Sequence, residues 1–189
     1  MKNLKIIKLL AILFISVLTF TACSNDDHND HDHEEELITT VTYTLTNDSN
    51  DSDVVTLTFE DLDGEGGNDG EYTPTNGAIL SANTTYTGVI KLENATESIA
   101  KNITEEVKTE GDEHEFFYLS NITGIAITKT DTDSNGNKLG IETSLTTAGA
   151  GTGTLTVILK HEPTKPNNGS ANNAGGSTDV EITFSVTVE

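Results

Sequence analysis

The sequence predicts an all-β domain over residues 37–189, an antiparallel β-sandwich of about eight strands with an immunoglobulin-like architecture. Apolar and polar residues alternate along segment after segment of this region, which is the period of a half-buried strand. The stretches between these segments are rich in turn-forming residues. The composition agrees, because tryptophan is absent and threonine, asparagine and glycine abound.

The alternation places each expected strand along the chain. It is clearest at the C-terminus, where Val180, Ile182 and Phe184 alternate with polar residues. A single segment, residues 98–107, has helical character and is too short to shape the fold. One-sided strands joined by long loops favour an open two-sheet sandwich over a barrel. The expected strands are residues 41–45, 55–59, 86–92, 113–119, 125–130, 139–145, 155–160 and 180–188.

The N-terminus has the pattern of a bacterial lipoprotein signal. Lys2, Lys5 and Lys8 make the N-terminus positive, and an apolar run extends over residues 6–20. Cys23 follows small residues and precedes acidic ones. Such a lipobox predicts cleavage of residues 1–22 and attachment of a diacylglyceryl group and palmitate-type acyl chains at Cys23. The alternatives are an ordinary secretory signal or a short anchor helix. Lipidation uses the one cysteine of the chain, which excludes disulfides and cysteine catalysis in the mature domain.

The charge of the chain excludes several classes of function. The chain has 31 acidic residues against 10 lysines and no arginine, so its net charge is −21. Such a charge disfavours nucleic acid and anionic lipid headgroups as partners and attracts cations. The sequence also lacks a G-x-S-x-G elbow, a P-loop and an H-E-x-x-H motif. We therefore expect a protein that is not an enzyme.

Residues 23–36 are expected to form a lipidated, disordered tether, because the segment contains no apolar residue after Cys23. His28, His31 and His33 lie there among carboxylates. Histidines this close on a flexible chain can bind Zn²⁺, Cu²⁺ or Ni²⁺. The affinity of such a site is low, because the chain must become ordered when the metal binds. The alternative is a solubilising spacer and export signal.

Two further histidines lie at expected strand ends. His114 precedes Phe116 and Tyr118 on one face of its strand, and His161 directly follows the strand over residues 155–160 and precedes Glu162. If the two strand ends meet, His114, His161 and a nearby glutamate such as Glu162 form a transition-metal site. The alternative is a pair of edge histidines that make local hydrogen bonds.

Residues 131–142 match the calcium-loop pattern D-x-[DN]-x-[DN]-G-x₅-E. Strands are expected on both sides of this loop, and Asn135-Gly136 is typical of a hairpin turn. The turn interpretation is therefore favoured, with a Ca²⁺ site as the alternative. The residues that would bind Ca²⁺ are Asp131, Asp133, Asn135 and Glu142.

Blocks along nearly the whole chain resemble a family. They are similar to blocks of small surface lipoproteins of Bacteroidota, flavobacteria in particular. The blocks are residues 34–41, 61–64, 83–88, 92–94, 103–106, 112–117 and 161–163. Some sequences of this set are named type 1 periplasmic binding fold superfamily proteins, although the alternation here predicts an all-β domain. The resemblance implies export to the outer face of the outer membrane, with the acidic residues after Cys23 as the export signal. It also implies association with a TonB-dependent transporter.

Together these features predict an outer-membrane, surface-exposed lipoprotein that acts as a non-catalytic binding module. It would capture a divalent metal (Zn, Cu or Ca), or a metal-bearing ligand, for a TonB-dependent uptake system. The alternative is a structural or protein-interaction subunit of an outer-membrane surface complex with no small ligand.

Overall fold

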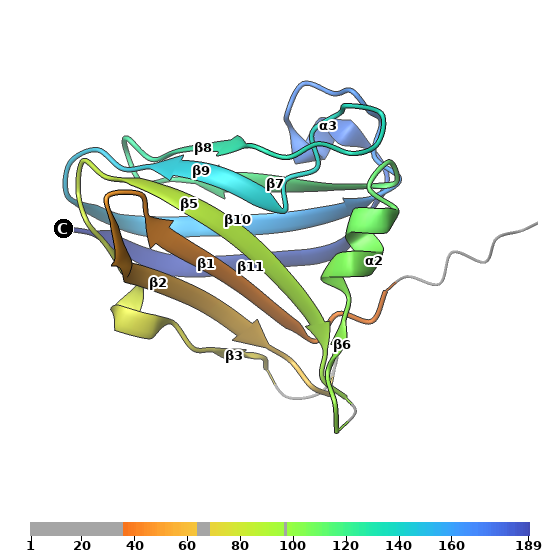
Figure 1. Cartoon of the computed structure of the whole chain (residues 1–189), viewed down its shortest axis with the longest axis horizontal. Helices are drawn as coiled ribbons and strands as arrows, with labels where there is room; N and C mark the ends of the chain where they lie inside the picture. The colour runs from red at the N-terminus through yellow and green to blue at the C-terminus, as the bar shows by residue number, and fades with distance from the viewer. Residues whose placement is uncertain (1–35, 64–68, 97) are drawn as a thin grey trace, which may run out of the picture. The chain divides into compact units, whose positions relative to one another are not determined.

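Two β-sheets packed as a sandwich form the described part of the chain, which confirms the predicted fold class (Figure 1). The computed structural model describes residues 36–63, 69–96 and 98–189. They belong to the compact unit Glu35–Glu189. The signal peptide, Cys23 and the tether residues His28, His31 and His33 lie outside the described residues. Among the described residues, no helix has the length and apolar character needed to cross a membrane.

The larger sheet has seven strands. Its order is β3 (Glu71–Tyr72), β2 (Asn50–Glu60), β1 (Thr40–Asn47), β5 (Thr85–Asn94), β9 (Glu142–Thr146) and β8 (Ala126–Lys129), and β6 (Lys101–Asn102) pairs with β5. The smaller sheet has the order β4 (Ile79–Leu80), β11 (Ser177–Val188), β10 (Gly151–His161) and β7 (His114–Ser120). β4 runs parallel to β11, so the smaller sheet is mixed and not purely antiparallel as the sequence predicted.

The core lies between the two sheets and is built from the alternating apolar residues. On β11, Val180, Ile182 and Phe184 are buried, whereas Glu181 between them is exposed. On β1, Val41, Tyr43 and Leu45 are buried in the same core. Burial on one face of each strand is the pattern that the period of two predicts.

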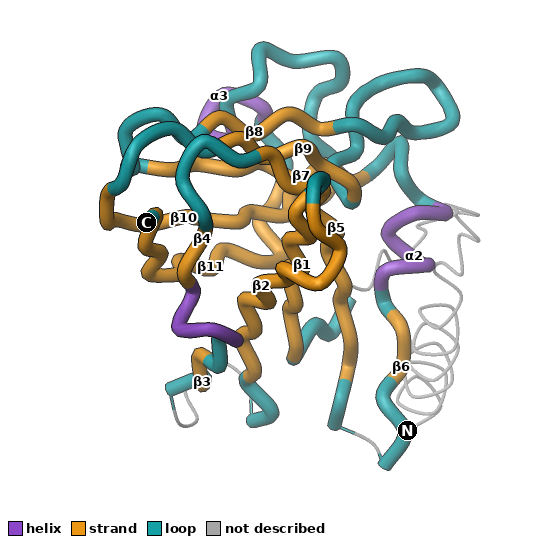
Figure 2. Tube along the Cα trace, turned by 60° about the vertical axis from the view of Figure 1, so that its left-hand side comes forward, coloured by secondary structure: helices purple, strands orange, loops and turns teal. Residues whose placement is uncertain are grey.

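Strand β7 is buried on both faces. Phe116 packs in the main core, and Phe117 packs on the opposite face with Ile158 and Ala174. Ala174 belongs to the short helix α3 (Ala171–Ala174), which lies in a stretch that the sequence predicted only as turns. The contacts of Ala174 with Phe117 and Ile158 place α3 over the face of β7 and β10 that points away from the main core. Figure 2 shows α3 in purple at the top of the view.

Two predicted elements begin later than expected. The strand over residues 139–145 is observed as β9, which starts at Glu142. Leu139 instead lies beside β7, where its carbonyl oxygen accepts a hydrogen bond from Phe116 N at 2.8 Å. The helical segment predicted over residues 98–107 is observed as α2 (Thr104–Thr109). It is shifted because residues 101–102 pair with β5 as β6.

A 3₁₀ turn, η1 (Thr75–Ala78), precedes β4.

A buried hydroxyl pair fixes the packing of β1, β5 and β9 and gives a prediction about stability. Tyr43 Oη and Thr143 Oγ1 are 2.7 Å apart, and a Cβ at Gly88 would lie 2.4 Å from Thr143 Oγ1 and 2.6 Å from Tyr43 Oη. We expect Gly88→Ala to lower the free energy of unfolding by about 3 kcal/mol, because both hydroxyls must move within a packed core. Val89→Ala is the control, since Val89 is exposed and its loss should cost below about 1 kcal/mol. Urea denaturation measures both, and equal effects would contradict this account.

Candidate metal centre

Four side chains that bear metal-ligating atoms meet at one end of the sandwich. They are Glu36, His114, His161 and Asp179, and one ligating atom from each lies within 4.8 Å of the others. The four residues come from different parts of the chain: the segment before β1, the start of β7, the end of β10 and the start of β11. The group therefore exists only when both sheets are formed.

Strand pairing brings the two histidines together. His114 and His161 are direct partners in the antiparallel register of β7 and β10. Directly opposed residues of an antiparallel pair lie close on the same face. Their rings stack with centroids 4.7 Å apart and planes inclined at 27°. The strand ends therefore meet as the metal-site hypothesis required.

A β-bulge turns Asp179 toward the histidines. In the pairing of β10 with β11, Leu159 faces Val180 and Lys160 faces Thr178, so Asp179 is the extra residue. Strict alternation would place Asp179 on the outer face with Glu181. The bulge breaks this alternation and re-aims the side chain. The Asp179 side chain is 1% exposed, and its Oδ2 lies 4.0 Å from His114 Nε2.

Glu36 completes the group from the opposite sheet. Its Oε1 lies 3.1 Å from His114 Nε2, and its side chain is 8% exposed. The sequence placed this residue in the tether, but it packs with the folded domain. Nearby backbone contacts hold the segment, because Thr39 N donates to Glu93 O of β5 at 3.0 Å and Ile38 packs against the core.

A hydrogen bond at Nδ1 determines which nitrogen of the His114 ring carries the proton. Nδ1 lies 3.1 Å from the carbonyl oxygen of Glu110, which can only accept a hydrogen bond. Nδ1 therefore carries the proton, and in the neutral ring Nε2 presents a lone pair toward Glu36. This is the arrangement of a metal-ligating histidine, in which a backbone carbonyl fixes the tautomer and the ring orientation.

The group is buried yet incompletely satisfied. His114 is fully buried, and Glu36 Oε2 makes no hydrogen bond within the described part of the chain. Buried carboxylates without hydrogen-bond partners are costly, and they are normally paired or bound to a metal. A divalent cation between two imidazoles and two carboxylates would balance the charge of the Glu36 carboxylate.

The carboxylate that the sequence proposed beside His161 is not part of this group. Glu162 is exposed and has a positive φ of 51°, at the point where the chain leaves β10. Glu36 and Asp179 take the expected place of Glu162 beside His114 and His161. Sequence reasoning missed both, because Glu36 lies in an acidic run and Asp179 falls on the outer face under strict alternation.

The loop over residues 131–142, which matches the calcium-loop pattern, is a turn stabilised by its own carboxylates. Asp133 accepts hydrogen bonds from the backbone N–H groups of Asn135 at 2.9 Å and Asn137 at 2.8 Å. Asp131 accepts two more, from Gly140 N at 2.7 Å and Ile141 N at 3.0 Å. Gly136 has a φ of 83°, which the turn interpretation requires. These contacts account for the acidic residues, and Glu142 is exposed at the start of β9.

The fold and this group define the described part of the chain as an all-β sandwich domain with a buried two-histidine, two-carboxylate centre. No protein-family model, no curated protein and no solved structure matches the chain. Any assignment of function therefore starts from the chemistry of these four residues.

Proposed function

We propose that this protein binds one divalent transition-metal ion at the group formed by Glu36, His114, His161 and Asp179. The observation that carries the proposal is the convergence of the four ligating atoms within 4.8 Å at a buried site. Four ligands about 2.1 Å from a tetrahedral ion lie roughly 3.4 Å apart. The 3.1 Å between Glu36 Oε1 and His114 Nε2 is close to that value, and the other ligand atoms must draw inward.

The ligand types favour Zn²⁺ or Cu²⁺ over Ca²⁺. Imidazole nitrogen suits zinc and copper, whereas Ca²⁺ prefers six to eight oxygen ligands. The two carboxylates balance the charge of a divalent ion in a buried setting. With four protein ligands the site resembles a closed, storage or structural type, which supports a binding role and not catalysis.

We further propose that the site works at the cell surface. The lipobox at Cys23 and the acidic residues after it support an outer-membrane lipoprotein, and the resemblance to surface lipoproteins supports delivery of the metal to a TonB-dependent transporter. In this proposal the tether residues His28, His31 and His33 form a second, weaker collecting site on the lipidated segment.

Titration of the purified, chelator-treated protein with Zn²⁺ tests the proposal. We expect one ion per chain to bind at the domain with a dissociation constant of about 1 μM or tighter, and to raise the melting temperature. A variant with alanine at His28, His31 and His33 is the control, since it should keep this ion. Loss of all zinc binding in the control, or a dissociation constant weaker than about 1 mM in the intact protein, would contradict the proposal.

A further inference from the structure

We infer that a cleft beside the candidate metal centre binds an organic cation, a protonated amine on an apolar or aromatic body. The cleft has a volume of about 730 Å³, which is in the range of small-molecule sites. It shares Glu36 and Asp179 with the metal centre and extends from there between the two sheets. The inference goes beyond the proposed function, because the rest of the cleft needs no metal.

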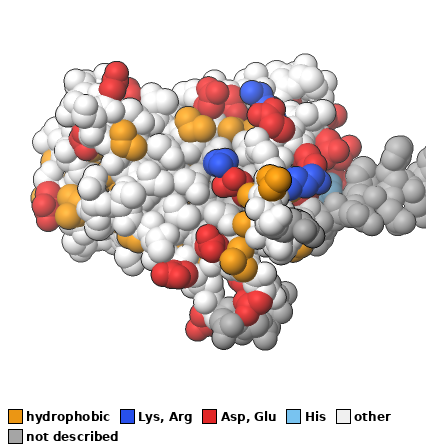
Figure 3. Space-filling view, turned by 60° about the horizontal axis from the view of Figure 1, so that its bottom comes forward, with side chains coloured by type: hydrophobic (Ala, Val, Ile, Leu, Met, Phe, Trp, Pro, Cys, Tyr) orange, Lys and Arg blue, Asp and Glu red, His pale blue; other side chains and the backbone are white. Residues whose placement is uncertain are grey.

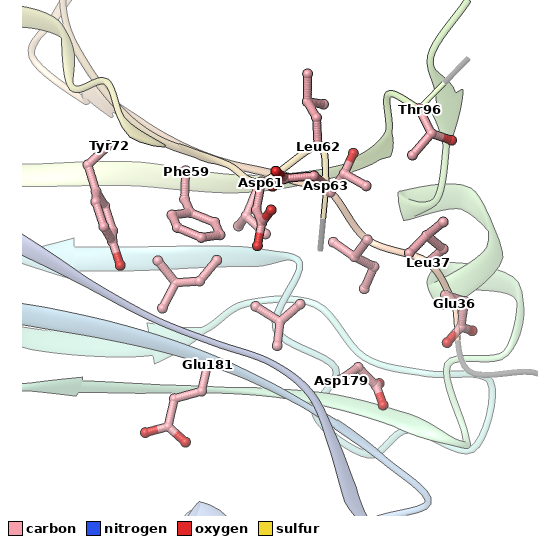
Figure 4. Close-up of a pocket in the computed structure, with 15 residues that line it drawn as sticks. Glu36, Leu37, Phe59, Asp61, Leu62, Asp63, Tyr72, Thr96, Asp179 and Glu181 are labelled. Carbon is pink, nitrogen blue, oxygen red and sulfur yellow. The ribbon is translucent and has the colours of Figure 1, made fainter. Parts of the chain in front are cut away.

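One end of the cleft is aromatic. Phe59 of β2 and Tyr72 of β3 pack with ring centroids 4.9 Å apart, and Phe184 of β11 meets Tyr72 edge-on at 5.9 Å. Figure 4 shows Phe59 and Tyr72 at the end of the cleft opposite Glu36 and Asp179. A face of this kind suits the body of an apolar ligand and also attracts cations.

Three large apolar side chains that line the cleft are about half exposed. Leu37 is 55% exposed, Leu62 is 50% exposed and Tyr72 is 51% exposed, and all three line the cleft. Exposed apolar side chains are unremarkable when scattered, but their grouping around a concave site indicates a ligand with an apolar part.

The charges that line the cleft select a cation. Its acidic residues are Glu36, Asp61, Asp63, Asp179 and Glu181, and no lysine lines it among the described residues. Figure 4 shows Asp61 between the aromatic end and the metal-centre end. In Figure 3 acidic side chains with apolar ones between them are spread over the face shown. A concave site lined by one sign of charge concentrates ligands of the opposite sign.

A buried oxygen points to a ligand independently of this charge. The Glu36 side chain is more than nine-tenths buried and lines the cleft, and its Oε2 makes no hydrogen bond within the described residues. An ammonium group can donate up to three hydrogen bonds. It therefore suits a cleft whose lining includes the Glu36 carboxylate.

Binding of 4-phenylbutylamine to the chelator-treated full chain tests the inference, with 4-phenylbutanol and 4-phenylbutanoate as neutral and anionic controls. By calorimetry or NMR we expect the amine to bind with a dissociation constant of about 1 mM or tighter, and both controls about tenfold more weakly or worse. Equal binding of the amine and either control would overturn the inference.

Variants locate the binding and separate it from the metal proposal. Asp61→Asn and Tyr72→Ala should each weaken amine binding by about threefold or more. Asp51→Asn changes an exposed carboxylate of β2 outside the cleft and should leave it unchanged. Equal effects of Asp61→Asn and Asp51→Asn would contradict the inference, whatever the result of the zinc titration.

Discussion

Replacing His114 with alanine is expected to weaken Zn²⁺ binding by at least about a hundredfold. Loss of an outer-shell partner of a metal ligand already costs about 10–100-fold in affinity, and loss of a ligand costs more. His114 is the ligand with the best-defined geometry, because its Nδ1 is fixed by Glu110 O and its Nε2 faces Glu36 Oε1 at 3.1 Å. Competition of the protein with a zinc-binding dye measures the change.

Glu162→Gln is the matched control for this prediction. Glu162 follows His161 directly but is exposed and outside the group, so the substitution should leave the zinc dissociation constant unchanged within about twofold. A loss in Glu162→Gln as large as that in His114→Ala would contradict the assigned ligand set.

Because His114 is fully buried, its replacement by alanine leaves a cavity that destabilises the fold. A second variant therefore tests the ligand set without making a cavity. Asp179→Asn keeps the shape of the side chain and removes its charge. We expect it to weaken zinc binding by about tenfold or more while the far-ultraviolet circular dichroism of the metal-free protein is retained. Zinc affinity equal to that of the unaltered protein in a folded Asp179→Asn would remove Asp179 from the ligand set.

The sequence was sufficient for the fold class because alternation directly records burial on a sheet. Val180, Ile182 and Phe184 show the period of two and are buried as predicted. The elements that the sequence missed are set by tertiary contacts. β3, β4 and β6 have two residues each, too few for a period to show, and α3 forms where it covers Phe117.

Two of the four residues of the candidate site could be predicted, because they lie on strands that the alternation reveals. His114 and His161 stand at the ends of two recognisable strands, so their meeting followed from a plausible pairing. Asp179 depends on a bulge opposite the Leu159–Lys160 step, and no feature of a single sequence marks where a strand inserts an extra residue. Glu36 depends on where the chain first contacts the domain. A short apolar pair directly after it, Leu37-Ile38, was the one available signal.

Replacing Asp133 with alanine is expected to cause a large loss in the free energy of unfolding. The Asp133 side chain is fully buried and lies 3.2 Å from Lys165 Nζ, which is 5% exposed and also donates to Gly111 O at 2.5 Å. Asp133→Ala would leave the Lys165 ammonium group buried without its anion. Breaking a buried pair from one side costs about 3–5 kcal/mol. We expect a loss of that size in the free energy of unfolding, measured by urea denaturation at neutral pH.

The effect of Asp133→Ala should depend on pH in a defined direction. Burial raises the pKa of the Asp133 carboxyl group, but hydrogen bonds from Asn137 and Lys165 outweigh burial, so the pKa lies below its ordinary value of 3.8. A lowered pKa in the folded state stabilises the fold fully above the ordinary value. This contribution is lost as the pH falls through the lowered pKa. The difference between the unaltered protein and Asp133→Ala should therefore be constant above about pH 4 and narrow at lower pH.

Asp112→Ala separates this interaction from a general effect of removing acidic charge. Asp112 lies next to Gly111 but is exposed, and an exposed substitution usually changes stability by about 0.5 kcal/mol or less. Removing a negative charge from a chain with a net charge of −21 should, if anything, reduce repulsion, so charge alone predicts no loss in either variant. A large loss in Asp133→Ala alone would therefore identify the buried contacts of Asp133, with Lys165 and with the backbone of the turn, as its cause. Losses within about 1 kcal/mol of each other would show that the turn over residues 131–137 does not depend on that pair.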